Sequence, residues 1–202
     1  MSTTAVISPP PFQAMTAFRK FSVAEYQKLI DVGVLTDEDR VELLENYLVL
    51  KTPANPPHDS TVTKLFRRLD RLAPAGYVVR CQVGSSLPDS QPEPDIAIAR
   101  ADERAFDARH PRPDEIALVI EVSDSSLHCD RVDKGRIYAR VSIPQYWVVN
   151  LVDRQVEVYT DPTGPVSVPV YRRRQDFAAG TTVPLELDGQ AVGTVSVGEL
   201  LP

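Results

Sequence analysis

The 202-residue sequence predicts an α/β domain in which helices flank a central mixed sheet. Two patterns support this fold class. Stretches with the apolar period of amphipathic helices alternate with short β-branched stretches that are typical of strands. In addition, residues 116–122 (IALVIEV) are apolar almost throughout, which indicates a central strand covered on both faces. Because no linker separates two apolar cores, we expect residues 21–202 to form a single domain.

The composition restricts the possible function classes. The chain is 43% apolar and 25% charged, with a formal net charge of -6, as is typical of soluble globular proteins. The sequence shows neither an apolar run of membrane-spanning length nor an export signal, so we expect a cytoplasmic protein without a membrane partner. Cys81 and Cys129 have no metal-site spacing. The acidity implies that a nucleic-acid role would need a local basic patch or bound metal ions.

Residues 1–20 contain three consecutive prolines among small and polar residues, so we expect a flexible N-terminal arm. A short helix follows. Ser22 and Glu25 have the spacing of a capping box, which predicts the start of this helix, and Gly33 predicts its end.

The segment RVELLENYLVLKT at 40–52 is typical of a hairpin that turns at Glu45 and Asn46. Prolines then interrupt the chain before an amphipathic helix predicted at 60–73, with one apolar face in the core. Its other face carries basic residues: Lys64, Arg67, Arg68 and Arg71. These side chains would contact phosphates or the acids of a partner, or they form an ordinary solvated helix face.

The rest of the chain alternates predicted strands with one further helix. The predicted strands lie at 77–83, 95–99, 116–122, 145–151 and 155–160. Residues 130–141 have a helical pattern that Gly135 weakens and Pro144 limits. The last forty residues predict more short strands and turns, without a site signal.

Two acidic residues interrupt apolar strands. Asp95 opens the strand at 95–99 directly after Pro94, and Glu121 lies near the end of the strand at 116–122. Burying an unpaired carboxylate is costly, so each acid either faces water at a strand end or has a partner. If the two strands pair, both carboxylates can bind one divalent cation, and such hard oxygen ligands suit Mg²⁺.

Lys134 lies thirteen positions after Glu121, on the next predicted helix. If that helix covers the strand ends, the lysine would position a water for attack on a phosphodiester, or help to deprotonate it, and offset the charge that grows on phosphorus. The alternative is a simple helix pair with Asp130 at i,i+4 spacing.

These residues resemble the Uma-two (Uma2) family of restriction-endonuclease-like proteins, within the PD-(D/E)xK nuclease superfamily. The resemblance runs from about Phe21 to Tyr159. It rests on the order of these segments: FSVAEYQKL, VELLENYLV, PANPPHDSTV, PEPDIAIA, LVIEVSDSS, DRVDKGRIYARVSIPQYWVV and VEVY. The resemblance implies a restriction-endonuclease-like core, a mixed sheet flanked by helices with the acids on a central hairpin-like unit.

The resemblance also implies roles for individual residues. Asp95 matches the superfamily's aspartate after proline and Glu121 its second acid, both as metal ligands. Ser123 stands where many members keep the catalytic lysine, and Lys134 matches the helix lysine that replaces it in this family. Glu42 matches an N-terminal glutamate and would be a third carboxylate that completes the metal site or holds a ligand water. Its alternative is an exposed strand glutamate.

Two further residues are secondary candidates. Tyr138 would orient Lys134 or pack beneath it, and His58 matches a histidine after the family's proline-rich turn, although lone histidines more often cap or pack. The sequence departs from the family at Glu45 and Asn46, where the family has Asp-Gly. This altered turn could shift the hairpin register and reverse the face on which Glu42 lies.

The sequence therefore predicts an endonuclease dependent on Mg²⁺ or Mn²⁺ that hydrolyses phosphodiester bonds, with DNA as the expected substrate. Arg67, Arg68 and Arg131 are weak candidates for holding phosphates, and a homodimer would allow both strands of a duplex to be cut. Two alternatives stay open. One is a catalytically inactive binding or scaffold module with the nuclease fold. The other is a metal-dependent hydrolase of a smaller phosphate ester.

Overall fold

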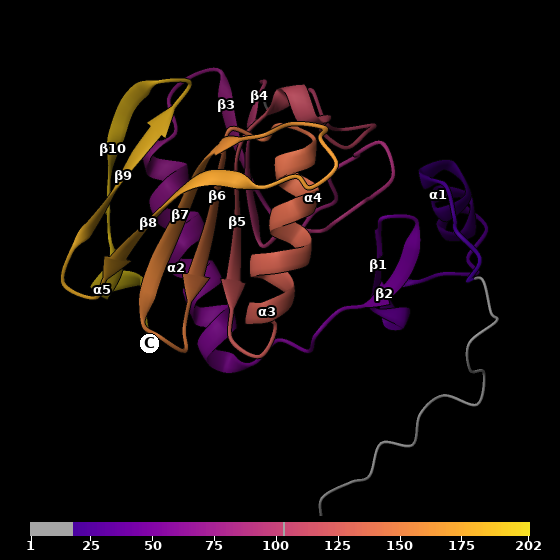
Figure 1. Ribbon diagram of the computed structural model, residues 1–202, viewed down its shortest axis with the longest axis horizontal. Coiled ribbons are helices and arrows are strands. Elements are labelled where there is room, and N and C mark those ends of the chain that lie inside the picture. Colours follow the sequence, from indigo (N-terminus) through magenta and orange to yellow (C-terminus); the bar gives the residue numbers. More distant parts are fainter. Residues whose placement is uncertain (1–17, 103) are drawn as a thin grey trace, which may run out of the picture.

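The computed structural model describes residues 18–102 and 104–202, so most of the predicted N-terminal arm lies outside the described residues. A six-stranded sheet forms the centre, in the order β3-β4-β5-β6-β7-β8 (Figure 1). Its strands are β3 Tyr77–Cys81, β4 Ile96–Arg100, β5 Ile116–Ser123, β6 Gln145–Asn150, β7 Gln155–Pro162 and β8 Tyr171–Ala178. β5 and β6 run parallel, whereas every other neighbouring pair is antiparallel. The predicted mixed sheet is thus confirmed.

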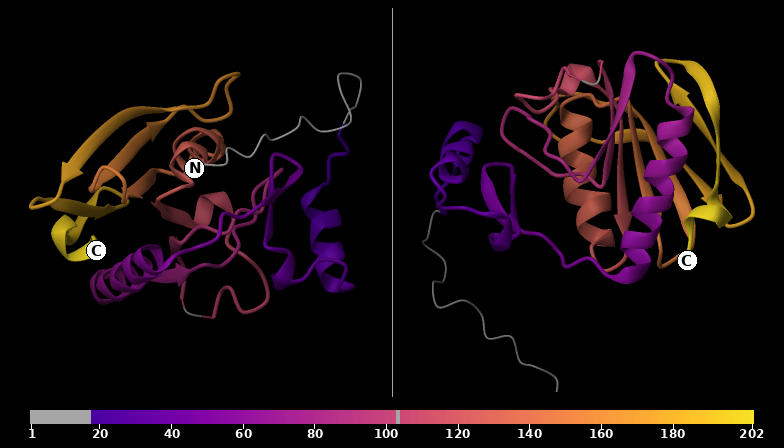
Figure 2. Two further views of the ribbon diagram at one scale, coloured as in Figure 1. Left: turned by 90° about the horizontal axis from the view of Figure 1, so that it is seen from below. Right: turned by 180° about the vertical axis from the view of Figure 1, so that it is seen from behind.

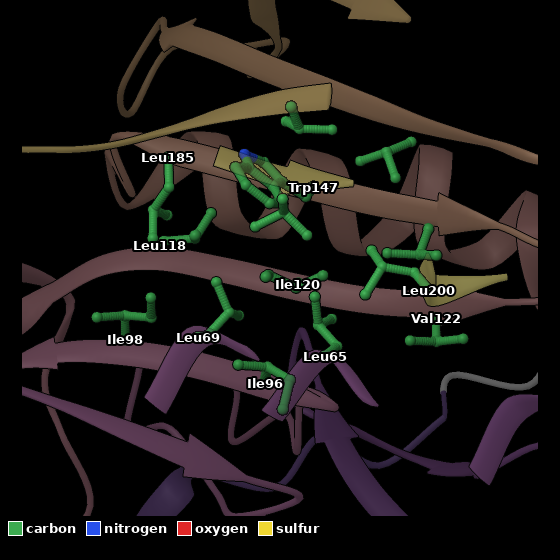
Figure 3. Close-up of a cluster of buried hydrophobic side chains, with 14 of the residues drawn as sticks. Leu65, Leu69, Ile96, Ile98, Leu118, Ile120, Val122, Trp147, Leu185 and Leu200 are labelled. Carbon is green, nitrogen blue, oxygen red and sulfur yellow. The ribbon is translucent and has the colours of Figure 1, made fainter. Parts of the chain in front are cut away.

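One face of the sheet is covered by α2 (Pro56–Leu72) and by a C-terminal unit. This unit consists of the hairpin β9 (Thr182–Leu187) and β10 (Gln190–Ser196), followed by α5 (Val197–Leu200). Leu65 and Leu69 of α2 are fully buried in the same cluster as Ile120 and Trp147 (Figure 3). The apolar face predicted for this helix therefore forms the larger core.

Helix α2 begins at Pro56, four residues before the predicted start. Pro56 and Pro57 occupy the first helical turn, where a missing N–H costs nothing because it has no intrahelical acceptor. The side chain of Asn55 caps this end by accepting a hydrogen bond from the His58 N–H at 3.1 Å.

A continuous helical run covers the opposite face of the sheet. It comprises α3 (Leu127–Cys129), the π-helical turn η3 (Asp130–Lys134) and α4 (Gly135–Arg140). Ile137 and Tyr138 pack with Val119 and Tyr146 in a second buried cluster. The prediction of a helix at 130–141 was correct in type, but the run begins earlier and includes the π-turn. Strand β5 lies between the two helical layers, and all eight of its residues are buried, as its sequence predicted.

The N-terminal elements lie to one side of the sheet, as the right-hand view of Figure 2 shows. They are α1 (Val23–Asp31), the 3-10 turn η1 (Asp37–Asp39) and the hairpin of β1 (Val41–Leu44) and β2 (Tyr47–Leu50). The capping box of Ser22 and Glu25 is present. Glu45 and Asn46 both have positive φ, 48° and 71°, as a tight hairpin turn requires. No helix among the described residues is long and apolar enough to cross a membrane.

Candidate active site

Asp95 and Glu121 lie beside each other on neighbouring strands. β4 and β5 are antiparallel with Ile96 opposite Ile120, which brings the residue before β4 next to Glu121. The backbone N–H of Val122 donates to Asp95 Oδ2 at 2.8 Å. Asp95 is 9% exposed and Glu121 3%, so both carboxyl groups are nearly out of water. The strand pairing on which the predicted acidic pair depended is therefore present.

Lys134 points from η3 into this pair of strands. Its Nζ lies 3.1 Å from Glu121 Oε1, 3.3 Å from Glu42 Oε1 and 3.8 Å from a carboxylate oxygen of Asp130. Burial alone would lower the pKa of this ammonium, but the surrounding carboxylates outweigh burial and raise the pKa well above its ordinary value. The group is therefore a permanent cation at neutral pH.

Glu121 is the most strongly perturbed acid. Burial raises its pKa to about 8; Lys134 opposes this rise, and the charges of Asp130, Asp95 and Glu42 add to it. The Tyr138 hydroxyl donates to Glu121 Oε1 at 2.8 Å. Tyr138 thus contacts the acid rather than orienting the lysine.

Glu42 comes from β1 and is only 4% exposed, so the alternative of an exposed strand glutamate is wrong. The altered turn at Glu45 and Asn46 has not reversed the hairpin's faces. Glu42 Oε2 accepts the backbone N–H of Glu93 at 3.1 Å, which leaves Oε1 to face Lys134.

His58 stands in the first turn of α2, where the Asn55 cap fixes the backbone. Its Nε2 lies 3.2 Å from Asp95 Oδ2. This hydrogen bond raises the pKa of the imidazole to about 9, against the effect of burial and with help from the charges of Asp95 and Asp59. Each of the two central acids therefore has a cationic partner from the protein: His58 for Asp95, and Lys134 for Glu121.

One cleft of about 440 Å³ lies between the base of the β1–β2 hairpin and the ends of β4 and β5, and it is lined by Glu42, His58, Asp95, Glu121 and Lys134. Within residues 18–102 and 104–202, no three His, Cys, Asp or Glu side chains are close enough to share one ion. The predicted triple set of Asp95, Glu121 and Glu42 is therefore not assembled. Asp95 and Glu121 still fit Mg²⁺, which usually takes only one or two protein carboxylates and completes its shell with water and substrate oxygens.

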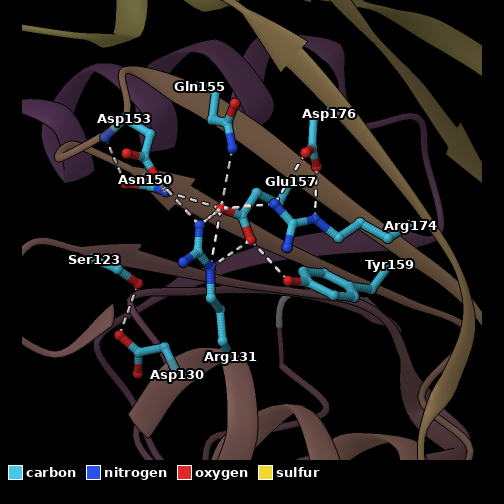
Figure 4. A network of polar contacts seen from close by, with 10 residues as sticks. All are labelled: Ser123, Asp130, Arg131, Asn150, Asp153, Gln155, Glu157, Tyr159, Arg174 and Asp176. Atoms are coloured by element: carbon cyan, nitrogen blue, oxygen red, sulfur yellow. Dashed lines mark hydrogen bonds and ion pairs between the residues drawn. The ribbon is translucent and has the colours of Figure 1, made fainter. Parts of the chain in front are cut away.

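The arginines predicted as weak phosphate ligands do not join the cleft. The guanidinium of Arg131 binds Glu157 and Asp153 on the far side of the helical run (Figure 4). Arg68 donates to the Thr194 carbonyl at 3.0 Å and so ties α2 to the C-terminal hairpin. Arg67 is exposed on the same helix. At a rise of 1.5 Å per residue, it lies about 13 Å along the helix axis from His58. Arg131 in particular is a structural ion-pair residue.

One side chain that the sequence did not single out as a site residue lies at the base of the cleft. Asp130, which appeared only as an i,i+4 partner of Lys134, is 3% exposed. It accepts a hydrogen bond at 2.7 Å from Ser123, the last residue of β5. The sequence alone does not show that Asp130 is buried, because its burial depends on how the helical run packs against the preceding strand.

Comparison with known proteins agrees with this architecture. No curated protein matches the chain. A solved structure titled as that of a "putative nuclease belonging to DUF820" from Anabaena variabilis ATCC 29413 has a TM-score of 0.62 and 14% sequence identity. The match covers 89% of this chain and 97% of that one. Such a likeness shows a shared fold. The Uma2 family model, described as "Putative restriction endonuclease", matches residues 23–193. Because this match covers most of the sequence, the chain belongs to the Uma2 family.

Proposed function

We propose that this protein is a metal-dependent endonuclease that hydrolyses phosphodiester bonds, with DNA as its substrate. The observation that carries the proposal is the arrangement of Asp95, Glu121 and Lys134 in one cleft, with the lysine ammonium 3.1 Å from Glu121. Membership of a family described as restriction endonucleases supports the reaction class.

Asp95 and Glu121 would hold Mg²⁺ or Mn²⁺. A bound ion of this kind polarises a phosphoryl oxygen and lowers the pKa of water. Glu42 is better placed as a counter-charge for Lys134 than as a third ligand, because Oε1 forms an ion pair with Lys134 and Oε2 accepts the Glu93 N–H. Tyr138 holds Glu121 through the bond to Oε1, which fixes how the carboxylate faces the cleft.

Lys134 would act as an electrostatic group. Its raised pKa supports a role in orienting the attacking water and offsetting negative charge on phosphorus, and disfavours the removal of a proton from that water. His58 would hold Asp95 in place while no ion is bound, and the Asn55 cap keeps the imidazole at the cleft.

Calorimetric titration with Mg²⁺ and Mn²⁺, combined with a plasmid-nicking assay, tests this proposal. We expect Asp95→Asn to lose both metal binding and nicking, and Lys134→Met to lose nicking while it still binds metal. Glu186→Gln, an exposed acid on β9, is the matched control and should behave like the wild type. If the wild type nicks DNA equally well in EDTA, the metal-dependent mechanism is wrong.

One observation favours the alternative of an inactive nuclease-fold module. The two central carboxylates already have protein cations beside them: Lys134 lies 3.1 Å from Glu121 and His58 lies 3.2 Å from Asp95. Such a module would bind no divalent ion in the calorimeter and would leave the plasmid intact. A homodimer stays a prediction, which a solution mass equal to one chain would contradict.

A further inference from the structure

Asp130 is an acid buried in the helical run beside the site, at 3% exposure. One of its oxygens, Oδ2, accepts hydrogen bonds from Ser123 Oγ at 2.7 Å and from Ser126 Oγ at 2.6 Å (Figure 4 draws the bond from Ser123). Ser123 ends the central strand, and Ser126 lies in the turn that follows it. Two hydroxyl groups therefore fix this carboxylate relative to the sheet.

The other oxygen, Oδ1, faces the ammonium of Lys134 at 3.8 Å. Lys134 is thus surrounded by three carboxylates from three separate elements: Glu42 from β1, Glu121 from β5 and Asp130 from its own turn. A lysine side chain is long and flexible, so its head group needs several fixed charges to occupy one position.

The backbone of the π-turn is also held at Asp130. Its carbonyl accepts the N–H of Gly135, five residues on, and the Tyr146 hydroxyl at 2.9 Å. The next residue, Arg131, binds Glu157 on β7. Short π-helical turns within α-helices are uncommon and are often found at functional sites. Asp130 and Arg131, the first two residues of this turn, therefore both bind side chains of the sheet.

We infer that Asp130 is a positioning residue. Ser123 and Ser126 fix its carboxylate, and this fixed negative charge holds the ammonium of Lys134 beside Glu121. This inference rests on the proposed role of Lys134. Ser123 would then contribute to the site indirectly, through its hydrogen bond to Asp130.

The negative charge of Asp130 distinguishes this role from simple packing. Asn at this position keeps the size of the side chain and an oxygen that can accept from both hydroxyl groups, but it removes the charge that faces Lys134. Asp133 provides a matched control, because it lies in the same turn, is 45% exposed and pairs with Arg136 at 3.3 Å. Asp133→Asn makes the same change of charge away from the cleft.

The first experiment measures how firmly the surrounding carboxylates hold the lysine ammonium, without any need for activity, because acetic anhydride reacts only with an accessible, deprotonated amine. Metal-free wild type, Asp130→Asn and Asp133→Asn are treated with trace acetic anhydride, and acetylation of each lysine is followed by peptide mass spectrometry. We expect Lys134 to react several-fold faster in Asp130→Asn alone, with the other lysines unchanged. Equal Lys134 rates in all three proteins would overturn the inference, whether or not the protein is a nuclease.

The second experiment is a double-mutant cycle with single-turnover nicking. Asp130→Asn should lower the cleavage rate about tenfold, with little change in the DNA concentration that gives half the maximal rate. In the Lys134→Met background, the same change should have no further effect. An equal loss in both backgrounds would mean that Asp130 acts through general stability, which contradicts the inference. A wild type without nicking would refute the proposed function, and the acetylation rates would then decide on Asp130 alone.

Discussion

The buried carboxylate of Glu157 supports a quantitative prediction about stability. Glu157 lies on β7 with its side chain fully buried. Burial would raise the pKa of this group, but hydrogen bonds from Arg131, Tyr159 and Asn150 outweigh burial and lower the pKa to about 2 (Figure 4). Because these partners bind the ionised form, replacement of Glu157 by glutamine should destabilise the folded state at neutral pH.

The lowered pKa gives the size of the effect. A shift from the ordinary value of 4.5 to about 2 corresponds to about 3 kcal/mol of folding free energy when each unit counts 1.36 kcal/mol. Solvent screens part of this, since the Arg131 side chain is 29% exposed. We therefore expect Glu157→Gln to lose about 2 kcal/mol at neutral pH. The folded pKa lies below the unfolded one, so this contribution is complete above pH 4.5 and disappears as the pH falls towards 2.

Urea unfolding at two pH values measures this effect. At about pH 3, less than half of the difference between wild type and Glu157→Gln should remain. Asp176→Asn is the control. Arg174 pairs with both Glu157 and Asp176, but the Asp176 side chain is 42% exposed, so its replacement should change stability little at either pH. If the loss in Glu157→Gln were equally large at both pH values, the effect would come from packing, and the electrostatic explanation would be refuted.

Three further predictions concern the cleft. Arg40 is an exposed cation on the rim of the cleft, so Arg40→Ala should reduce the slope of log DNA affinity against log salt concentration by about 1. Arg71→Ala, which removes an exposed cation outside the cleft, should leave this slope unchanged. Anisotropy titrations of the two variants at several salt concentrations test this prediction. Because the pKa of Glu121 is raised to about 8, protons compete with metal at lower pH. Mg²⁺ affinity should therefore rise by up to about tenfold per pH unit and level off above about pH 8. A Mg²⁺ affinity that does not change with pH in the calorimeter would contradict this prediction. Ser123 lies on the same face of β5 as Glu121, so Ser123→Lys should restore part of the nicking lost in Lys134→Ala; no recovery would count against the lysine's role.

The sequence could predict those parts of the site that depend on local patterns. The apolar run of β5 identified the central strand, and two such strands with acids near their ends suggested that Asp95 and Glu121 meet. The hairpin turn at Glu45 and Asn46 was also correct, because asparagine adopts positive φ readily. Antiparallel pairing of β4 and β5 then brought the acids together, and the following helical run could reach them only from one face.

Other parts depend on partners that are distant in sequence. Arg131 was a candidate phosphate ligand, but its partner Glu157 lies 26 residues away on a strand whose pairing only the fold defines. The bond between His58 and Asp95 spans 37 residues and arises because α2 begins at Pro56, earlier than its apolar period indicates. The π-turn has no sequence signature that separates it from an α-helix, so the burial of Asp130 could not be predicted.

The charge balance of the cleft determines the order in which ligands can bind. Four buried carboxyl groups surround its base: Glu42, Asp95, Glu121 and Asp130. His58 and Lys134 supply two positive charges, so two negative charges remain in a poorly solvated site, where uncompensated charge is costly. Protons compensate part of this excess, as the raised pKa of Glu121 indicates. One divalent cation would compensate all of it.

Under the proposed function, a phosphodiester would bring a further negative charge, so we expect the cation to bind before nucleic acid enters. DNA affinity, measured with Ca²⁺ in a duplex anisotropy assay, should therefore fall strongly when EDTA removes the ion. In Asp95→Asn, one buried negative charge and one proposed metal ligand are lost together, so the difference between Ca²⁺ and EDTA should largely vanish. If the wild type bound DNA equally well under both conditions, the contact surface would have to lie outside the acidic cleft. The nuclease fold would then serve as a binding module, because no phosphate would approach Asp95 and Glu121.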